Sequence, residues 1–190
     1  MIKIAVDYDG TIADTNLVKS EWLKRNMGID VPPWRCDRTL CEAIIGKEKY
    51  DEMAKYVYGR ELSLGASEVR GAREALKQLK ELGSIFVLTA RNIETLQWAE
   101  MWLAENGVND NVDEVISSLG QPKLKLCQQY GIKVLIDDDQ RHIFEEEPSD
   151  IRKILLKNGM DGILEIPEYV TICRNWGEVL AVVRKRVCGK

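Results

Sequence analysis

Residues 1–15 read MIKIAVDYDGTIADT, an apolar run that leads directly into two aspartates, Asp7 and Asp9, separated by one residue. The segment 2–6, IKIAV, is short, apolar and rich in β-branched residues, which predicts a strand. Side chains at positions i and i+2 of an extended chain lie on the same side. Asp7 and Asp9 are therefore expected to be presented together, while Tyr8 points away. The segment is either a strand ending in a polar turn or a strand that presents two carboxylates to a site.

Apolar runs alternate with helical patterns along the rest of the chain. Strands are predicted at 84–88, 112–116, 133–136 and, from a weaker pattern, 169–173; helices are predicted at 71–83, 93–107, 122–131 and 176–187. Asn92 stands where the second of these helices needs a cap. Strands this apolar suit a parallel sheet with helices on both faces. The sequence therefore predicts an α/β fold with a doubly wound, parallel, Rossmann-like sheet and right-handed crossovers.

The section from residue 15 to about 68 departs from this alternation. It contains several helical patterns and no strand candidate. A connection of more than fifty residues is too long for a simple crossover between two strands. The sequence therefore predicts a small all-helical cap at 15–68, inserted after the first strand into a core made of residues 1–14 and 69–190.

Composition narrows the class of protein further. The 190 residues carry a formal charge of −4, which gives no general attraction to nucleic acid or to an anionic membrane. No apolar run approaches the roughly 18 residues that a membrane span needs, and no targeting segment is visible, so a cytoplasmic protein is expected. The run EEEPSD at 145–150 is expected to be a solvated turn.

Cysteine usage gives no sign of disulfides or zinc. The cysteines are odd in number, fall in no paired spacing, and stand beside a single histidine, His142, which makes a poor zinc set. Free thiols are expected at all five positions: Cys36, Cys41, Cys127, Cys173 and Cys188. Any bound metal is expected to have oxygen ligands, which favours Mg²⁺.

Polar side chains follow three of the predicted strands at their carboxyl ends. They are Asp7, Thr89, Asp137, Asp138 and Asp139. Open parallel sheets bind ligands beyond this edge. Lys123 begins the helix that enters the last of these strands, and Lys125 is an alternative to it. A calcium-binding EF-hand loop is excluded, because Gly10 comes at the fourth position of the loop and not at the sixth.

These residues in this order resemble the motifs of a known family. Asp7-Tyr8-Asp9-Gly10-Thr11, Thr89, Lys123 and Asp137-Asp138 are similar to the four motifs of the haloacid dehalogenase-like (HAD) hydrolase superfamily, over residues 1 to about 140. The LTAR segment at 88–91, the position of Lys123 and the helical insert most resemble the 5′(3′)-deoxyribonucleotidase group and its uncharacterised bacterial and phage relatives.

The resemblance implies phosphoryl transfer through an aspartyl-phosphate. It makes Asp7 the nucleophile, Asp9 the general acid and base, Thr89 a hydrogen-bond donor to a transferring oxygen and Lys123 the cation that offsets charge. It also implies Mg²⁺ held by Asp7, by the main chain at Asp9, and by an acid of the IDD segment. The metal ligands we predict are Asp7, Asp9, Asp137 and Asp138, and the sequence leaves open which of residues 137–139 binds directly.

Contacts to the substrate are expected from both parts of the chain. Candidates for binding phosphate or the leaving group are Gly10, Thr11, Ala90, Arg91, Trp34 and Arg35. A carboxylate at Asp9 favours phosphate esters, because dehalogenation has no leaving oxygen to protonate. The expected partner is a small phosphorylated metabolite, with a nucleotide as one candidate. A phosphosugar mutase and a nucleic-acid 3′-end phosphatase are alternatives, as is a non-catalytic module that binds metal or phosphate. The acidic balance disfavours nucleic acid, and the oligomeric state is open.

Overall fold

A computed structural model of the chain describes residues 1–144 and 150–187. A six-stranded sheet forms its centre, with all strands parallel and in the order β3-β2-β1-β4-β5-β6. The strands are β1 (Ile2–Val6), β2 (Gly83–Thr89), β3 (Glu114–Ser117), β4 (Val134–Asp137), β5 (Arg152–Leu156) and β6 (Val170–Cys173). The predicted parallel α/β fold is confirmed.

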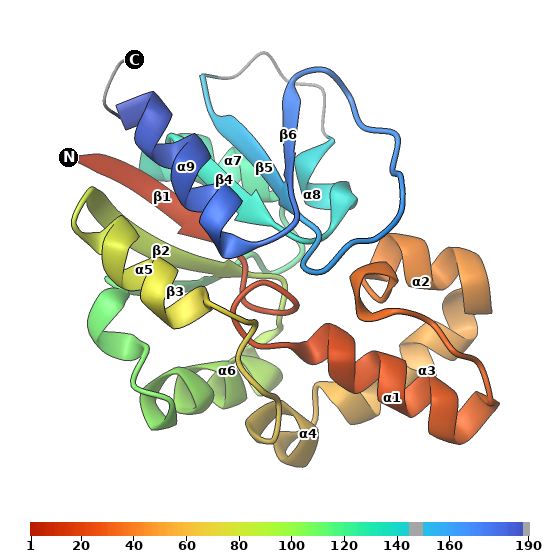
Figure 1. Cartoon of the computed structure of the whole chain (residues 1–190). Helices are drawn as coiled ribbons and strands as arrows, with labels where there is room; N and C mark the ends of the chain where they lie inside the picture. The colour runs from red at the N-terminus through yellow and green to blue at the C-terminus, as the bar shows by residue number, and fades with distance from the viewer. Residues whose placement is uncertain (145–149, 188–190) are drawn as a thin grey trace.

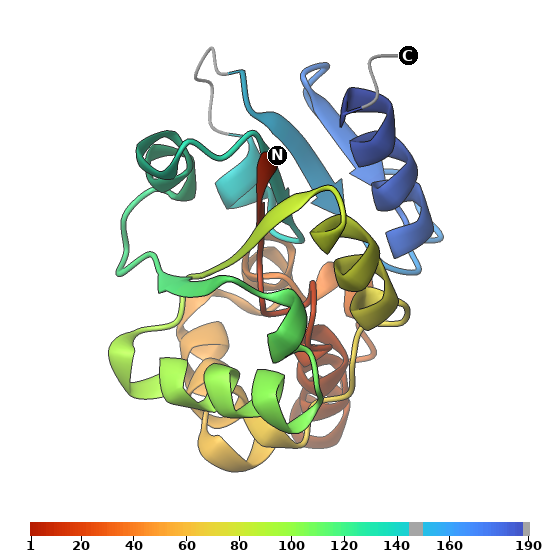
Figure 2. The ribbon, with the colours of Figure 1, turned by 90° about the vertical axis from the view of Figure 1, so that its left-hand side faces the viewer.

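Helices cover both faces of the sheet. They are α5 (Ala72–Lys80), α6 (Ile93–Glu105), α7 (Lys123–Tyr130), α8 (Gln140–Ile143) and α9 (Trp176–Val187), and a 3-10 turn, η2, spans Asn109–Asn111. Ile4 and Val6 of β1 pack in the same core as α5, α6 and α9, whereas Ala5 packs in the core that includes α7 and α8. Figure 2 shows α5 and α9 on one side of the sheet and α7 on the other.

One strand was missed by the sequence analysis, and another was misplaced. β5 (Arg152–Leu156) lies between β4 and β6. It begins with two basic residues, so its apolar run is short, and Lys153 is nevertheless buried. β3 was predicted at 112–116 and is found at Glu114–Ser117. Asp113 instead accepts a hydrogen bond from the backbone N–H of Ile85, at 2.7 Å, just before the strand begins.

The predicted helical insertion after β1 is confirmed. It consists of α1 (Thr15–Met27), the 3-10 turn η1 (Pro33–Arg35), α2 (Arg38–Ile45), α3 (Lys47–Val57) and α4 (Arg60–Leu64). These helices enclose a small core of their own, with members that include Leu23, Cys41, Tyr50, Met53 and Val57. In Figure 1 the helices α1 to α3 lie beyond the carboxyl ends of β1 and β4, as a cap should.

Two connections join the cap to the core and run side by side. The N–H of Asp14 donates to the carbonyl of Ser67 at 2.7 Å, and the N–H of Val69 donates to the carbonyl of Ile12 at 2.8 Å. The domain boundaries at 14/15 and 68/69 stay predictions.

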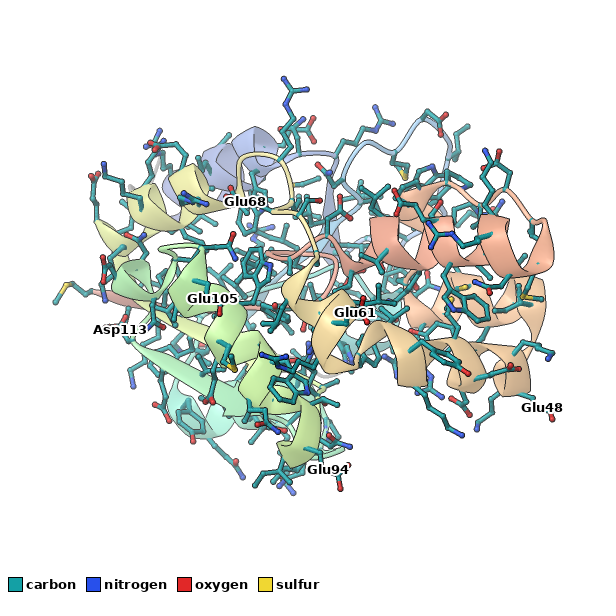
Figure 3. All side chains as sticks on the ribbon, turned by 90° about the horizontal axis from the view of Figure 1, so that it is seen from below. Glu48, Glu61, Glu68, Glu94, Glu105 and Asp113 are labelled. Carbon is teal, nitrogen blue, oxygen red and sulfur yellow. The ribbon has the colours of Figure 1, made fainter. Side chains whose placement is uncertain are left out.

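Helix α4 lies at the junction of cap and core. Figure 3 shows Glu61 of α4 between Glu48, at the far end of the cap, and Glu94 and Glu105 of α6. Contacts join α4 to both α3 and α6. The cap is therefore supported by a core helix as well as by its two connections.

The structure also bears on the cysteines, the predicted turn at 145–150 and membrane-spanning helices. Cys36, Cys41 and Cys173 are buried and free, Cys127 is buried, and Cys188 lies outside the described residues. The predicted turn at 145–150 also lies outside them, except for the exposed Asp150. Within residues 1–144 and 150–187, no helix is both long enough and apolar enough to span a membrane.

Candidate active site

The strand order places a crevice where β1 and β4 are neighbours. The chain leaves β1 toward β2 and β3 on one side and returns to β4 on the other. Such a switch in direction opens the ligand-binding crevice of doubly wound sheets, beyond the carboxyl ends of the strands. Asp7 follows β1 directly, and Asp137 ends β4. The N–H of Asp7 donates to the carbonyl of Ile136 at 2.8 Å, so backbone pairing fixes both carboxylates at this point.

Three buried carboxylates meet at the crevice. Oxygens of Asp7, Asp137 and Asp138 all lie within 4.8 Å of one another. Burial, with the negative charge of Asp137 as a further cause, raises the pKa of Asp7 to about 7, and the nearby Lys123 ammonium only partly offsets this. Burial and the charge of Asp7 also raise the pKa of Asp138 well above its ordinary value. Crowded, desolvated carboxylates of this kind favour a bound cation or proton.

Lys123 supplies one positive charge to this group. Its ammonium lies 2.5 Å from Asp7 Oδ1 and 2.7 Å from Asp137 Oδ2, and the side chain is only 1% exposed. Burial would lower the pKa of Lys123, but the two carboxylates raise it above its ordinary value. Lys125, the alternative from the sequence, lies exposed on the same helix.

Asp9 faces the same cavity as Asp7 but has a different partner. Arg91 Nε and Nη2 donate to the two oxygens of Asp9, each at 2.9 Å. Burial alone would raise the pKa of Asp9, but the charge and hydrogen bonds of Arg91 hold that pKa below its ordinary value. Arg91 also donates to Ser63 Oγ of the cap at 2.8 Å. The predicted substrate-binding arginine is therefore a partner of the predicted acid.

Gly10 makes the tight turn after Asp9 possible. Its φ is +76°, a conformation that other residues rarely adopt. A Cβ at this position would lie 2.4 Å from Asp138 Oδ2 and 2.3 Å from Asn16 Nδ2. The Gly10 N–H donates to the carbonyl of Ala13 at 2.8 Å, which occupies it within the turn. Gly10 therefore lets the turn pass directly beside Asp138.

The cap holds the segment that carries Asp138. Asn16 of α1 donates to Asp138 Oδ2 at 2.5 Å. Lys157, directly after β5, donates to the carbonyl of Asp138 at 2.6 Å. It also donates to Oδ2 of Asp37, the N-cap residue of helix α2, at 2.7 Å. Asp139 is turned away from the other two acids, because it accepts from Thr39 Oγ1 at 2.7 Å and caps α8. The structure thus groups Asp137 and Asp138, but not Asp139, with Asp7.

A cavity of about 630 Å³ separates core and cap above these residues. The core side of its lining includes Asp7, Asp9, Ala90, Arg91, Lys123, Asp137 and Asp138. The cap side includes Lys19, Asp37, Arg38, Tyr50, Asp51, Lys55 and Tyr58. Glu94 also lines the cavity, and Figure 3 shows it at the end of α6. A cavity of this volume can hold a small-molecule ligand between core and cap.

Several predicted site residues lie apart from this lining. Thr89 is fully buried, and its Oγ1 accepts from the N–H of Arg91 at 3.2 Å. Thr11, within the turn, is also fully buried. Trp34 and Arg35 lie on the far side of the cap junction, where Trp34 Nε1 donates to Asp161 Oδ1 at 3.0 Å. The structure brings neither Trp34 nor Arg35 to the cavity.

Asn16, Lys19, Asp37 and Lys157 were missed by the sequence analysis. The first two are buried on α1. A polar pair at i and i+3 on a helix that follows the first motif was the available signal. No local sequence signal marked Asp37 and Lys157, since their contact joins positions 120 residues apart.

The donor set fits a divalent metal such as Mg²⁺. All three candidate ligands are carboxylates, the oxygen donors that Mg²⁺ prefers. Three acids crowded in a buried site beside one lysine leave negative charge without compensation. The Asp9 carboxylate is not part of this cluster, so a contribution from Asp9 would have to come from its main chain.

The fold of the chain, unlike its sequence, is similar to that of known proteins. No family model and no curated protein matches the sequence. Among solved structures, a predicted phosphoglycolate phosphatase from Haemophilus somnus matches at 17% identity and a TM-score of 0.58, covering 95% of this chain and 96% of that one. L-2-haloacid dehalogenase from Xanthobacter autotrophicus, with chloropropionic acid covalently bound, matches at 14% and 0.58, covering 97% and 99%. A HAD family hydrolase from Deinococcus radiodurans, with bound phosphate and sodium, matches at 12% and 0.63, covering 96% and 95%.

The chain therefore has the fold of the HAD-superfamily hydrolases, cap included. Matches at this identity establish the fold, and these three structures include a predicted phosphatase and a dehalogenase. The narrower similarity to the 5′(3′)-deoxyribonucleotidase group stays a prediction.

Proposed function

We propose that this protein is a magnesium-dependent phosphomonoesterase that hydrolyses its substrate through an aspartyl-phosphate. The observation that carries the proposal is the contact of the Lys123 ammonium with both Asp7 and Asp137, beside Asp138, at the floor of a cavity. A carboxylate nucleophile and a phosphate dianion repel each other, so attack needs nearby positive charge. The site offers a buried lysine and a cluster of acids suited to a cation.

In this mechanism Asp7 attacks phosphorus and forms the acyl phosphate, while the bond from phosphorus to the leaving oxygen breaks. Arg91 lowers the pKa of Asp9 in this structure, and a phosphate dianion placed beside Asp9 would raise that pKa again. Asp9 then gives a proton to the leaving oxygen and later takes one from the water that hydrolyses the intermediate. Arg91 holds Asp9 with two hydrogen bonds and orients it toward the cavity. Lys123 offsets the negative charge around Asp7 throughout.

Asp7, Asp137 and Asp138 would hold the metal. When bound, Mg²⁺ would neutralise charge on the phosphoryl oxygens and on these three acids. Asn16 and Lys157 orient Asp138 from outside the cluster, the role that outer partners play in metal sites. A carboxylate at Asp9 favours phosphate esters over haloacids as substrates, because dehalogenation has no leaving oxygen to protonate.

The test is release of inorganic phosphate from an aryl phosphate such as p-nitrophenyl phosphate, with and without Mg²⁺. Turnover is expected only with the metal, and Asp7→Asn is expected to abolish it, because the amide cannot form the acyl phosphate. Asp110→Asn, an exposed residue of η2, is the matched control and should keep full activity. Steady turnover by purified, folded Asp7→Asn would refute the nucleophile assignment.

The natural substrate class follows from a second screen. Nucleoside monophosphates, sugar phosphates and 3′-phosphorylated oligonucleotides represent the nucleotidase, mutase and nucleic-acid-end alternatives. Sugar-phosphate isomerisation without phosphate release would favour a mutase. We expect small phosphorylated metabolites to be turned over in preference to oligonucleotides, because the cavity of about 630 Å³ suits a small leaving group.

A further inference from the structure

Lys19 of α1 is a buried cation that the proposed mechanism does not use. Its side chain lines the cavity from the cap side, and the residue is only 2% exposed. The ammonium donates to Asn16 Oδ1 at 3.1 Å. It also lies 5.8 Å from the ring centre of Tyr50 and 5.6 Å from that of Tyr58. These close neighbours, an amide and two phenol rings, are uncharged. Burial would lower the pKa of Lys19, but the two rings and, from further away, the carboxylates of Asp138 and Asp9 raise it well above its ordinary value.

Three other buried cations, Arg91, Lys123 and Lys157, have carboxylate partners. The nearest carboxylate oxygen lies 2.9 Å from Arg91, 2.5 Å from Lys123 and 2.7 Å from Lys157. Within the described part of the chain, no carboxylate oxygen lies within 4.0 Å of the Lys19 ammonium. Burying a charge without such a partner is costly. A buried cation that lines a ligand cavity is therefore expected to meet its anion in the ligand.

The two tyrosines are poorly suited to stack on a nucleobase. A second cation lies over each ring. The Arg38 guanidinium is 5.3 Å from the ring centre of Tyr50, and the Arg91 guanidinium is 5.1 Å from that of Tyr58. Each ring is thus already engaged by two cations, which cation–π attraction holds in place. Lys55, an exposed lysine at the cavity wall, adds positive charge on the same side. Arg38 is itself paired with Asp51, which also lines the cap side. Among the described residues, Lys19 and Lys55 are therefore the cap-side cations with no carboxylate oxygen within 4.0 Å, and the two rings hold Lys19.

We propose that Lys19 is the specificity residue of a second anion subsite, which binds a negatively charged group on the leaving group of the substrate. The phosphoryl group itself is met from the core side by Lys123 and the acid cluster, whereas Lys19 faces the cavity from the cap. The substrates would be small phosphomonoesters that carry a carboxylate or a second phosphate. The inference rests on the proposed phosphatase function.

A matched pair of substrates tests the subsite. The meta and para isomers of carboxyphenyl phosphate are compared with the corresponding carbamoylphenyl phosphates, which have the same shape and no charge. The measured quantity is the ratio of kcat/KM within each pair, at fixed Mg²⁺. Wild type is expected to favour at least one carboxylate by about 10- to 100-fold, the usual effect of a hydrogen bond to a charged group. A phenyl bisphosphate in the same series shows whether phosphate serves better than carboxylate.

Variants assign the preference to Lys19. Lys19→Met should bring the ratio to about one, and Lys19→Arg, which keeps the charge and guards against misfolding, should retain a preference. Lys49→Met, an exposed lysine of α3 outside the cavity lining, should leave the ratio unchanged. A wild-type ratio near one in both isomers would overturn the subsite. An equal loss on both members of the pair in Lys19→Met would overturn it too, because Lys19 would then act on their common part.

Binding without turnover separates this inference from the proposed function. If the wild-type protein hydrolyses no ester at all, the phosphatase proposal fails. The subsite is then judged by thermal shift with 4-carboxybenzylphosphonate and its carboxamide. Tighter binding of the carboxylate in wild type, lost in Lys19→Met, would support the anion subsite alone, and equal binding would overturn it.

Discussion

The two walls of the cavity are built in different ways. On the core side, Asp7 and Asp137 are fixed by the backbone pairing of β1 and β4. On the cap side, Lys19 is held by side-chain contacts, with Asn16 of its own helix and with Tyr50 of α3. Strand ends in a sheet position groups rigidly, which the chemical step requires. The difference implies that changes to the core wall reduce kcat, whereas changes to the cap wall alter affinity for the metal and the leaving group.

The largest of the following effects is expected for Asp9→Asn on the core wall. Loss of general acid–base catalysis should lower kcat about 10²–10⁴-fold for alkyl phosphates, whose leaving oxygen needs a proton. The loss should be much smaller for p-nitrophenyl phosphate, whose leaving group is already stable as an anion. Rates for both substrates are measured in wild type and variant. An equal fall for both would mean that Asp9 positions Arg91 and does not donate a proton.

The next prediction compares two lysines of α7, the buried Lys123 of the core wall and the exposed Lys125. Lys123→Met removes the cation between Asp7 and Asp137 and should lower kcat about 10²–10³-fold, as loss of preorganised charge does. It should also lower the free energy of unfolding, because removing one partner of a buried ion pair usually costs ~3–5 kcal/mol. Lys125→Met, on the exposed side of the same helix, is the control and should change neither quantity. Comparable losses in both variants would contradict the assignment.

The contact between the walls is tested by removing the charge of Lys157. Lys157 joins the carbonyl of Asp138 to Asp37 of the cap. Its loss should weaken Mg²⁺ binding about 10–100-fold, the usual effect of removing an outer partner of a metal ligand. The double variant Lys157→Met, Asp37→Asn is used, since Asn keeps the helix cap and leaves no buried charge unpaired.

Mg²⁺ affinity is measured by thermal shift across a metal titration, independently of activity. Lys133→Met, an exposed lysine paired with Asp150, serves as the control. Unchanged Mg²⁺ affinity in the double variant would show that the cap does not orient the metal site.

The smallest effect is expected for His142, which lines the rim of the cavity. Burial, which opposes the charged form, lowers its pKa from 6.5 to about 4. As pH falls from 6.5 toward 4, the unfolded chain takes up this proton before the native one, so the stability contributed by neutral His142 is lost over that range. It is fully present above about pH 6.5. His142→Gln should therefore flatten the acid side of the stability profile while changing kcat less than about threefold.

This titration can be read directly, because the chain has a single histidine. Its ring proton should shift in the NMR spectrum with a midpoint near pH 4. A midpoint near 6.5 would instead mean that His142 is a cation in mildly acid solution, and would contradict the expected effect of burial.

Much of the core wall could be predicted because its pattern is local. Short, nearly continuous apolar runs define the strands, and parallel strands bring their carboxyl ends to one edge. The positions of Asp7, Asp137 and Asp138 follow from that rule. The N-cap of α6 is also a local signal, because Asn92 accepts from the N–H of Thr95, three residues later, at 3.0 Å. β5 escaped prediction because its buried Lys153 breaks the apolar pattern.

The sequence by itself determined the class of fold, the helical insertion and the edge of the sheet at which the acids gather. The tertiary structure decided which acids join Asp7, that Lys123 and not Lys125 reaches them, and that Arg91 pairs with Asp9. It also placed Lys19 against the cavity and Trp34 away from it. Side-chain direction and burial depend on contacts between segments far apart in the chain, and no local period records those contacts.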